Sequence, residues 1–293
     1  MQEGITWIKG DTGKEQLLLN DTALPLESFE NCHRKYSGPV FIIASGPSVL
    51  DFPIEKYRNY PMIAMNGSIC CLQENNVQPL FYLCDDIGVV AAHKEAFRLG
   101  VENAKYCCLG DRVIFNAQQQ IPGIFDGRKI YMMQRVNRFL GGKAVSDRRF
   151  AWCARSNPDF EVEWSLFNQK KNRIGFSRNL CKGYFNGRTI AYSAVQLAYH
   201  LGFDKIFLVG VDMGGKAEQF YFCEAAGSMG RSRILEDFPK YILPSFDLMS
   251  RKVINKSFSV FNLSASSRIP GTIVPKINIA SLDKMLSYSN KTN

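Results

Sequence analysis

The sequence predicts an α/β fold in which a single Rossmann-like parallel sheet carries helices on both faces. Three short apolar runs support this prediction, at residues 40–44, 62–65 and 79–84. Each is short and nearly unbroken in its apolar character, as strands buried on both faces of a parallel sheet are. A fourth run, Ile206 to Val211, follows an amphipathic stretch from Ile190 to Leu201, which predicts a helix that ends at Gly202.

The rest of the sequence suggests further segments before, within and after the predicted sheet. Residues 1–37 are polar and charged, and we expect an N-terminal extension there. The predicted division is an extension at 1–37, a Rossmann-like domain at 38–127 and 179–275, a basic insertion at 128–178, a lid at 216–245, and a C-terminal helix and tail at 276–293. Further expected elements are helices at 89–99 and 246–255, a strand or loop at 106–109 and a late strand at 258–263.

Small or polar residues follow each predicted strand at its carboxyl end. Ser45-Gly46-Pro47-Ser48 follows the first strand, Asn66-Gly67 the second, Asp85-Asp86 the third and Asp212 the fourth. Because ligands of open α/β sheets bind outside the carboxyl ends of the strands, this repetition predicts a nucleotide site. No Gly-x-Gly-x-x-Gly follows a strand and no Walker-type Gly-Lys-Ser/Thr is present, so neither a dinucleotide nor a P-loop is favoured.

The predicted helix at 190–201 begins with a sequence suited to anions. Asn186-Gly187-Arg188-Thr189 supplies a capping side chain, a flexible backbone position and a cation. These lie beside the positive end of the helix dipole, where unpaired N–H groups can bind a phosphate. The simplest interpretation is an anion site.

The net charge of +9 is concentrated in one segment. Residues 128–178 hold twelve Lys or Arg and four Asp or Glu, which gives +8, interleaved with Trp and Phe. This mixture suits a surface that meets anionic lipid or a polyanionic acceptor, and nucleic acid would also fit. A solvated insertion without a partner is the alternative.

Cysteine and histidine usage suggests no metal site. The nine cysteines include no C-x-x-C and the three histidines are scattered, so we expect reduced cysteines and a cytosolic protein. No window reaches about 18 uninterrupted apolar residues, and no signal sequence opens the chain, which predicts a soluble or peripheral protein.

Five motifs in the same order resemble a known family. They are Ser45-Gly-Pro-Ser48, Ile63-Ala-Met-Asn-Gly-Ser68, Pro79-Leu-Phe-Tyr82, Asn186-Gly-Arg-Thr-Ile-Ala-Tyr192 and Gly210-Val-Asp212. They resemble the lipopolysaccharide core biosynthesis proteins of the WaaZ type, which add a third 3-deoxy-D-manno-octulosonic acid (Kdo) to the inner core. More distantly, the order of elements is similar to that of bacterial sialyltransferases with a modified Rossmann domain.

The resemblance implies a CMP-activated ulosonic acid donor, no metal and no cofactor. By motif, Gly46 and Ser48 would line the cytidine and phosphate, and Asn66 the phosphate or ribose. Arg188 and Thr189 would bind the donor sugar or its carboxylate. The expected donor site also includes Pro47, Gly67, Asn186, Asp212 at the nucleotide end, and Tyr221 from the lid.

The chain departs from the sialyltransferases at the catalytic base. Those enzymes place a histidine after the lid, but this chain has no histidine beyond His200. The base is therefore expected to be a carboxylate, with Asp86 favoured and with the alternatives Asp85, Glu224 and Asp237. Asp85 or Asp86 could instead cap a helix. His200 is expected on the polar side of a helix end, and His93 on a helix surface.

Three functions follow from these residues. The first is an inverting, metal-independent transfer of Kdo from CMP-Kdo to a Kdo residue of the lipid A-core acceptor, at the cytoplasmic face of the inner membrane. In it, the basic segment 128–178 contacts the membrane surface. The second is sialic acid transfer from CMP-sialic acid. The third is a nucleotide- or nucleic-acid-binding protein without transferase activity, which the polar strand ends make less favoured because they suit a small-molecule pocket.

Overall fold

The computed structural model describes residues 5–9, 15–19, 22–214 and 233–289. Eight strands form one sheet in which every neighbouring pair is parallel. In spatial order they are β13 (Ser259–Asn262), β12 (Lys205–Val209), β5 (Pro39–Ile43), β6 (Met62–Met65), β7 (Phe81–Cys84), β8 (Tyr106–Gly110), β9 (Ile130–Met133) and β4 (Leu26–Glu27). The predicted fold class is confirmed.

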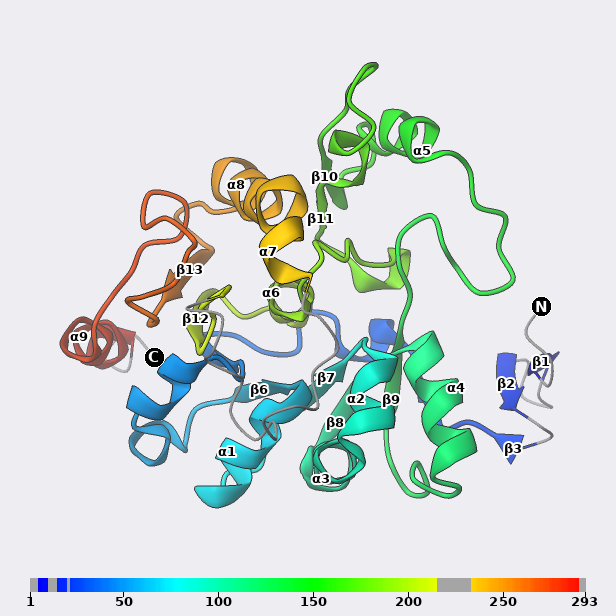
Figure 1. Ribbon diagram of the computed structural model, residues 1–293, viewed down its shortest axis with the longest axis horizontal. Helices are drawn as coiled ribbons and strands as arrows, with labels where there is room; N and C mark the ends of the chain where they lie inside the picture. Colours follow the sequence, from blue (N-terminus) through cyan, green and yellow to red (C-terminus); the bar gives the residue numbers. More distant parts are fainter. Residues whose placement is uncertain (1–4, 10–14, 20–21, 215–232, 290–293) are drawn as a thin grey trace.

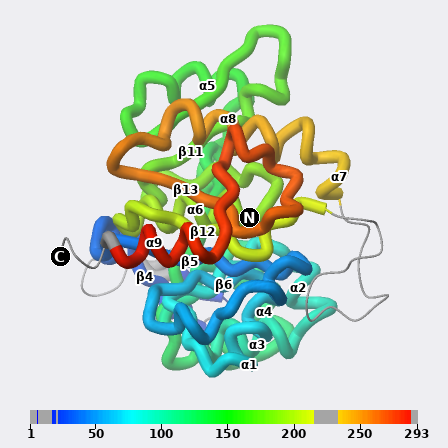
Figure 2. The backbone as a smooth tube through the Cα atoms, turned by 90° about the vertical axis from the view of Figure 1, so that its left-hand side faces the viewer, coloured from blue at the N-terminus to red at the C-terminus, as the bar shows by residue number. Residues whose placement is uncertain are grey.

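Helices cover both faces of this sheet (Figures 1 and 2). One face carries α1 (Ile69–Glu74), α2 (Ile87–Ala92), α3 (Lys94–Asn103), α4 (Asp111–Gln120) and α9 (Ile279–Ser289). The other carries α6 (Ile190–Leu201) and α8 (Leu243–Lys252). Short 3₁₀ helices occupy Phe29–Cys32, Pro47–Asp51, Ile54–Tyr57, Asn66–Ser68, Lys171–Arg173 and Leu180–Lys182.

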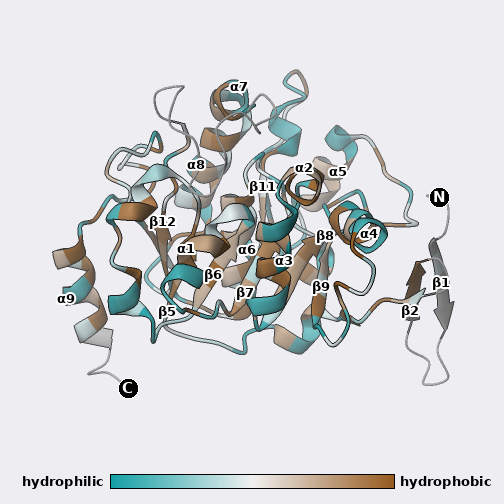
Figure 3. Ribbon diagram, turned by 60° about the horizontal axis from the view of Figure 1, so that its bottom comes forward, coloured by the Kyte–Doolittle hydropathy of each residue, from teal (hydrophilic) through white to brown (hydrophobic). Residues whose placement is uncertain are grey.

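The apolar runs are unbroken because each strand contributes to two cores. In β5, Val40 and Ile42 pack with α6, whereas Phe41 and Ile43 pack on the opposite face, and all four are fully buried. Successive side chains of a strand point to opposite faces, so a strand covered on both faces needs apolar residues at every position. The hydrophobic colouring of the central strands shows this pattern (Figure 3).

The order of strands reverses between β5 and β12. From β5 the chain adds β6, β7, β8 and β9 in one direction, and it then returns to place β12 and β13 on the other side of β5. The loops that leave β5 and β12 therefore run to opposite sides and leave a crevice between them. The predicted ligand edge lies at this switch point.

Helix α6 ends as the sequence predicts, but the helix expected at 89–99 and the expected position of His200 differ from the structure. Gly202 adopts a left-handed conformation with φ 103° and its N–H bonds to the last turn of α6. The single helix expected at 89–99 is two helices, α2 and α3, separated at His93, whose backbone is non-helical (φ −129°, ψ 49°). Apolar spacing continues across this break and so could not reveal it. The expectation for His200 is wrong.

His200 lies in the core rather than on a polar surface. Its Nδ1 accepts a hydrogen bond from the Leu180 N–H (3.2 Å) and its Nε2 lies 2.9 Å from the Phe29 carbonyl oxygen. Burial lowers the pKa of His200 to about 4, so the ring is neutral at physiological pH. Its role is to join α6 to the 3₁₀ helices at Phe29–Cys32 and Leu180–Lys182.

Two segments contribute more to the fold than the sequence suggests. The 128–178 segment begins with β9, a member of the main sheet, and residues 147–177 then form a lobe beyond α6 (Figure 1). This lobe contains α5 (Asp147–Ala154), β10 (Phe160–Val162) and β11 (Gly175–Ser177), with β10 and β11 antiparallel. The 1–37 segment contributes β4 to the sheet edge, after β1 (Ile5–Lys9), β2 (Glu15–Leu19) and β3 (Thr22–Ala23) form a separate antiparallel sheet.

The segment predicted as a lid is described only in its last part. Residues 234–245 form α7 (Ile234–Asp237), a π-helical turn (Phe238–Ile242) and the start of α8. Residues 216–232 lie outside the described residues, so the lid stays a prediction. Within the described part of the chain, no helix is both long enough and apolar enough to cross a membrane.

Candidate functional site

A cleft of about 600 Å³ opens at the switch point of the sheet. One wall comes from the carboxyl ends of β5, β6, β7 and β12, and the other from the start of α6 and from α7. Of the predicted site residues it contains Asn66, Asp85, Asp86, Asn186, Arg188, Thr189, Asp212 and Asp237. The polar strand ends thus meet in one place, as the sequence predicted.

The other predicted residues do not line the cleft or are not described. Gly46, Pro47, Ser48 and Gly67 do not line it, although Ser45 does. Tyr221 and Glu224 lie outside the described residues, so their roles stay predictions.

The turn after β5 is shaped by a contact within the protein. A Cβ atom on Gly46 would lie 2.3 Å from the Gly210 carbonyl oxygen, so only glycine allows this approach. The Asp212 carboxylate accepts hydrogen bonds from the Ser48 N–H (3.0 Å) and hydroxyl (2.5 Å). Gly46, Ser48 and Asp212 therefore hold the ends of β5 and β12 together.

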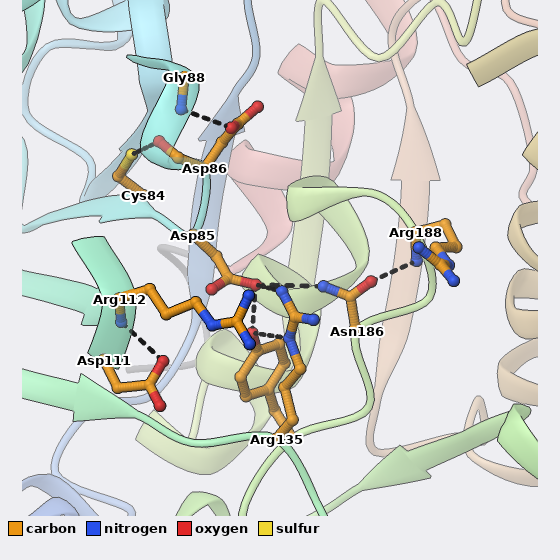
Figure 4. Close-up of polar contacts among 10 residues, drawn as sticks. Cys84, Asp85, Asp86, Gly88, Asp111, Arg112, Arg135, Asn186 and Arg188 are labelled. Carbon is orange, nitrogen blue, oxygen red and sulfur yellow. Dashed lines mark hydrogen bonds and ion pairs between the residues drawn. The ribbon is translucent and has the colours of Figure 1, made fainter. Parts of the chain in front are cut away.

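The Asp85 side chain connects the two walls of the cleft through hydrogen bonds (Figure 4). Its Oδ2 accepts hydrogen bonds from Arg135 Nη2 (2.8 Å), the Tyr184 hydroxyl (2.5 Å) and Asn186 Nδ2 (3.1 Å). The Asp85 side chain is only 11% exposed. A carboxylate oxygen with three donors is already occupied, so this arrangement favours a structural role for Asp85 over the predicted alternative of a base.

The pKa values of its partners agree with this role. Burial alone would lower the pKa of Arg135, but the Asp85 charge and the hydrogen bonds to Asp85 and Tyr184 outweigh it, so the pKa lies above its ordinary value and the guanidinium stays charged. Burial, and then the Asp85 charge, raise the pKa of Tyr184 well above its ordinary value. The phenol therefore stays protonated and donates to Asp85.

The two remaining carboxylates differ in their partners. Asp86 caps α2 through a hydrogen bond from the Gly88 N–H to its Oδ1 (2.8 Å), as the helix-cap alternative anticipated. Asp237 is only 7% exposed, and within the described residues its carboxylate has no hydrogen-bond partner. An unpaired carboxylate in a cleft is costly to the fold, and such groups are concentrated at functional sites.

Asn66 presents a polar atom that the fold leaves unused. Its backbone is left-handed (φ 47°), which asparagine tolerates better than most residues. Its Oδ1 is buried and has no partner among the described residues. Ser68 fixes this turn by accepting from the Met65 N–H (2.9 Å) and donating to the Ile43 carbonyl oxygen (2.6 Å). The site therefore presents a hydrogen-bonding group at the end of β6.

Arg188 is held in place without being neutralised. Its N–H donates to Asn186 Oδ1 (3.1 Å), and its guanidinium carbon lies 5.3 Å from the centroid of the Tyr241 ring. Within the described residues it has no salt-bridge partner. The adjoining Thr189 makes no side-chain cap to α6, and the first helical residues Ile190 and Ala191 line the cleft. A cation and the N-terminus of α6 are thus available to an anion.

Two ionisable residues at the cleft were not predicted as site residues. His93 was expected on a helix surface, but it lines the cleft from the break between α2 and α3, and Arg233 lines it from the start of α7. A helical pattern that continues through His93 gave no signal of its position. Arg233 lies next to a Gly-Ser-rich stretch without periodicity, so its location could not be inferred either.

The charges of the cleft residues do not form a metal site in the described part of the chain. Four aspartates and two arginines line the cleft, and three of those aspartates, Asp85, Asp86 and Asp212, already bind protein donors. No group of three or more His, Cys, Asp or Glu among the described residues could hold a metal ion. The arrangement is suited to binding an anion next to a carboxylate that can accept a proton.

Comparison with known families identifies a match over most of the chain. The model of the family described as 3-deoxy-D-manno-octulosonic acid transferase WaaZ matches residues 29–280. A probable 3-deoxy-manno-octulosonic acid transferase of Salmonella typhimurium is 29% identical over 248 residues, which cover 84% of this chain and 89% of that protein. A protein of the same description from Escherichia coli is 26% identical over 245 residues, covering 84% of each.

Two solved structures are more distantly similar. The MAf glycosyltransferase from Magnetospirillum magneticum has 18% sequence identity and a TM-score of 0.46, and the match covers 88% of this chain and 35% of that one. The sialyltransferase CstII from Campylobacter jejuni, in complex with CMP-3FNeuAc, has 10% identity and a TM-score of 0.38, covering 86% of this chain and 98% of that one.

We predict that Asp85→Ala lowers the free energy of unfolding by about 2 to 4 kcal/mol, because it leaves the Tyr184 hydroxyl and the Arg135 guanidinium without their acceptor. Urea denaturation measures this change. Asp126→Ala, at an exposed turn, is the control and should change stability by no more than about 0.5 kcal/mol. Equal stabilities of the two variants would contradict the structural role of Asp85.

Proposed function

The chain belongs to the 3-deoxy-D-manno-octulosonic acid transferase WaaZ family, and on this basis we propose that it transfers Kdo from CMP-Kdo to a Kdo residue of the lipopolysaccharide inner core. We propose further that the reaction inverts the anomeric centre and needs no metal ion. The observation that carries this proposal is the switch-point cleft, in which, among the described residues, Arg188 has no salt-bridge partner and the Asn66 amide oxygen has no hydrogen-bond partner.

The cleft suits a nucleotide-activated acidic sugar. Its volume of about 600 Å³ lies in the range of pockets that enclose small molecules. A CMP-linked ulosonic acid carries a phosphate and a carboxylate, and the cleft offers Arg188, Arg233 and the N-terminus of α6 to these two anions. Asn66 would accept a hydrogen bond from a hydroxyl group of the CMP-linked sugar or from the amino group of the cytidine.

The leaving group can be stabilised by these groups. When the glycosidic C–O bond to the phosphate breaks, CMP leaves with the bonding electron pair and its phosphate gains negative charge. Arg188 and the N–H groups at the start of α6 are positioned to stabilise that charge by electrostatic interaction. Fixed donors of this kind can serve where other transferases use a metal ion, which supports the metal-independent reaction.

We propose that Asp237 is the general base. It would accept the proton of the acceptor hydroxyl while that oxygen bonds to the anomeric carbon on the face opposite CMP, so that one displacement inverts the centre. Asp86 was favoured from the sequence, but it already uses one oxygen to cap α2, whereas the Asp237 carboxylate has no partner among the described residues. Asp86, and His93, which the sequence did not suggest as a base, are the alternatives at the same cleft.

The lobe at 147–177 and the residues before it provide a surface for the lipid-linked acceptor. Of the described residues, five large apolar side chains in segment 128–178 are exposed: Phe139, Val145, Trp152, Leu166 and Phe167. Phe167 is 92% exposed, and the Arg155 guanidinium lies 3.6 Å from the centroid of the Trp152 ring. Exposed aromatic residues among cations suit the interface of an anionic membrane, and we place the protein at the inner-membrane surface, on its cytoplasmic side.

We predict that incubation with CMP-Kdo and a Kdo-containing lipid A acceptor, in the presence of a chelator, adds the mass of one Kdo to the acceptor. Mass spectrometry measures this gain, with CMP-sialic acid as a parallel donor. Arg188→Ala should lower the rate at least about 100-fold, because the phosphate loses its cation, while the fold is retained. Transfer from CMP-sialic acid alone would contradict the proposal that CMP-Kdo is the donor. Loss of activity in the presence of the chelator would contradict the proposal that the reaction needs no metal ion.

We predict that Asp237→Asn lowers kcat about 100-fold or more with little change in the KM for CMP-Kdo, because a base acts on the acceptor proton and not on donor binding. Asp86→Asn is the matched control, since asparagine caps a helix as well as aspartate does, and His93→Gln tests the third group. A larger loss of kcat in either of these variants would assign the base to that residue instead.

We predict that the protein co-sediments with vesicles of phosphatidylethanolamine and phosphatidylglycerol, but not with phosphatidylcholine, and that Phe167→Glu weakens this binding. Leu50→Glu is the control, because Leu50 is an exposed apolar residue (66%) outside the segment. Unchanged binding of the Phe167 variant would mean that the segment is only a solvated surface. Steeply salt-dependent RNA binding without vesicle binding would favour nucleic acid as its partner.

A further inference from the structure

A second, smaller cavity adjoins the cleft. Its volume is about 230 Å³, and Asn186 and Arg188 line both spaces. The cavity is too small for a whole nucleotide sugar but can take part of a ligand. Its other walls come from the segment after β9, the 147–177 lobe and Tyr241. The lobe therefore builds a cavity as well as a surface.

Four arginines line this second cavity, which we call the arginine cavity. Arg135, Arg138, Arg173 and Arg188 line it, and Asp147 is its one acidic lining residue in the described part of the chain. Four positive charges and one negative charge give a net charge of +3. Even if Asp85, which pairs with Arg135 from the cleft side, is counted as well, the net charge is +2. The fold therefore leaves positive charge in excess here.

Asp147 holds two of these arginines without using all their donors. It accepts from Arg138 Nη2 (2.9 Å) and from Arg173 Nε (2.6 Å). A guanidinium has five N–H donors, so each arginine keeps donors that can reach a further oxyanion. Asp147 thus orients Arg138 and Arg173 as a pair instead of neutralising both.

The same walls carry aromatic rings. Tyr184, Phe185, Phe150 and Tyr241 all line the cavity. Aromatic faces beside fixed arginines suit an acidic sugar, whose ring packs on the aromatic side chains while its carboxylate or phosphate binds the guanidinium groups. An aliphatic or neutral ligand would leave the excess charge unpaired.

We propose that the arginine cavity is the acceptor subsite, and that it binds an oxyanion of the acceptor sugar, either carboxylate or phosphate. This inference rests on the transferase function proposed above. Because Arg188 and Asn186 border both spaces, an acceptor sugar bound in the arginine cavity lies beside the donor in the cleft. The positions of the two spaces therefore bring the attacking hydroxyl and the donor sugar together.

Titration calorimetry on the full chain tests this proposal with three probes: Kdo, its methyl ester and inorganic phosphate. We expect Kdo or phosphate to bind with saturating CMP present, and the uncharged ester to bind at least about tenfold more weakly than Kdo. The tighter of the two anions identifies the carboxylate or the phosphate as the group recognised.

Variants locate the binding. Arg173→Gln should weaken anion binding about tenfold, and Asp147 keeps Arg138 as its partner in this variant, so the fold is retained. Lys171→Gln removes an exposed charge two residues away that does not line the cavity, and should leave binding unchanged. Equal binding by both variants, displacement of the anion by CMP, or no binding of either anion would overturn the proposal.

This experiment separates the two claims. If the wild-type protein transfers no Kdo but binds the anion through Arg173, the subsite stands and the proposed reaction fails. If it transfers Kdo but Arg173→Gln alters neither anion binding nor the KM for the acceptor, the reaction stands and the subsite fails.

Discussion

The Asp85 carboxylate determines the shape of the site. One of its oxygens accepts hydrogen bonds from Arg135, in the segment after β9, and from Tyr184 and Asn186, in the loop that precedes α6 (Figure 4). Asp85 directly follows β7, so these contacts join the carboxyl edge of the sheet to the opposite wall of the cleft. Tyr184 and Arg135 also line the arginine cavity, and Asn186 lines both spaces. A single buried carboxylate therefore separates and supports the two cavities, and the position of Arg188 follows from the orientation of Asn186.

The polar residues of the cleft fall into two groups with different tasks. Asp85 and Asp212 are used by the fold, because protein donors occupy their oxygens. Among the described residues, Asn66 Oδ1 and the Asp237 carboxylate have no hydrogen-bond donor, and Arg188 has no salt-bridge partner. Buried or confined polar groups without partners lower stability, so their retention at one edge of the sheet is most simply explained by a ligand that supplies the partners.

The hydrophobic pattern predicted the central strands of the sheet, but it predicted neither β9 and β4 nor the different roles of the polar residues that follow the strands. Runs such as Val40 to Ile43 are apolar at every position because both faces are covered, and this feature is visible in the sequence. Asp85 and Asp86 are adjacent and chemically identical, and only the three-dimensional positions of Arg135 and Gly88 show that one supports the walls while the other caps α2. Partners separated by 50 or more residues leave no local signal. The position of His93 at the cleft was not predicted either, because a helix break without glycine or proline does not alter the apolar spacing.

The central claim is that the switch-point cleft, and not the arginine cavity, binds the nucleotide of the donor. A crystal structure of the protein with CMP tests this claim most directly. We expect the phosphate beside Arg188 and the start of α6, and the ribose or the base within hydrogen-bonding distance of Asn66 Oδ1. CMP bound among Arg138, Arg173 and Tyr241 instead, with the cleft empty, would contradict the assignment of both spaces.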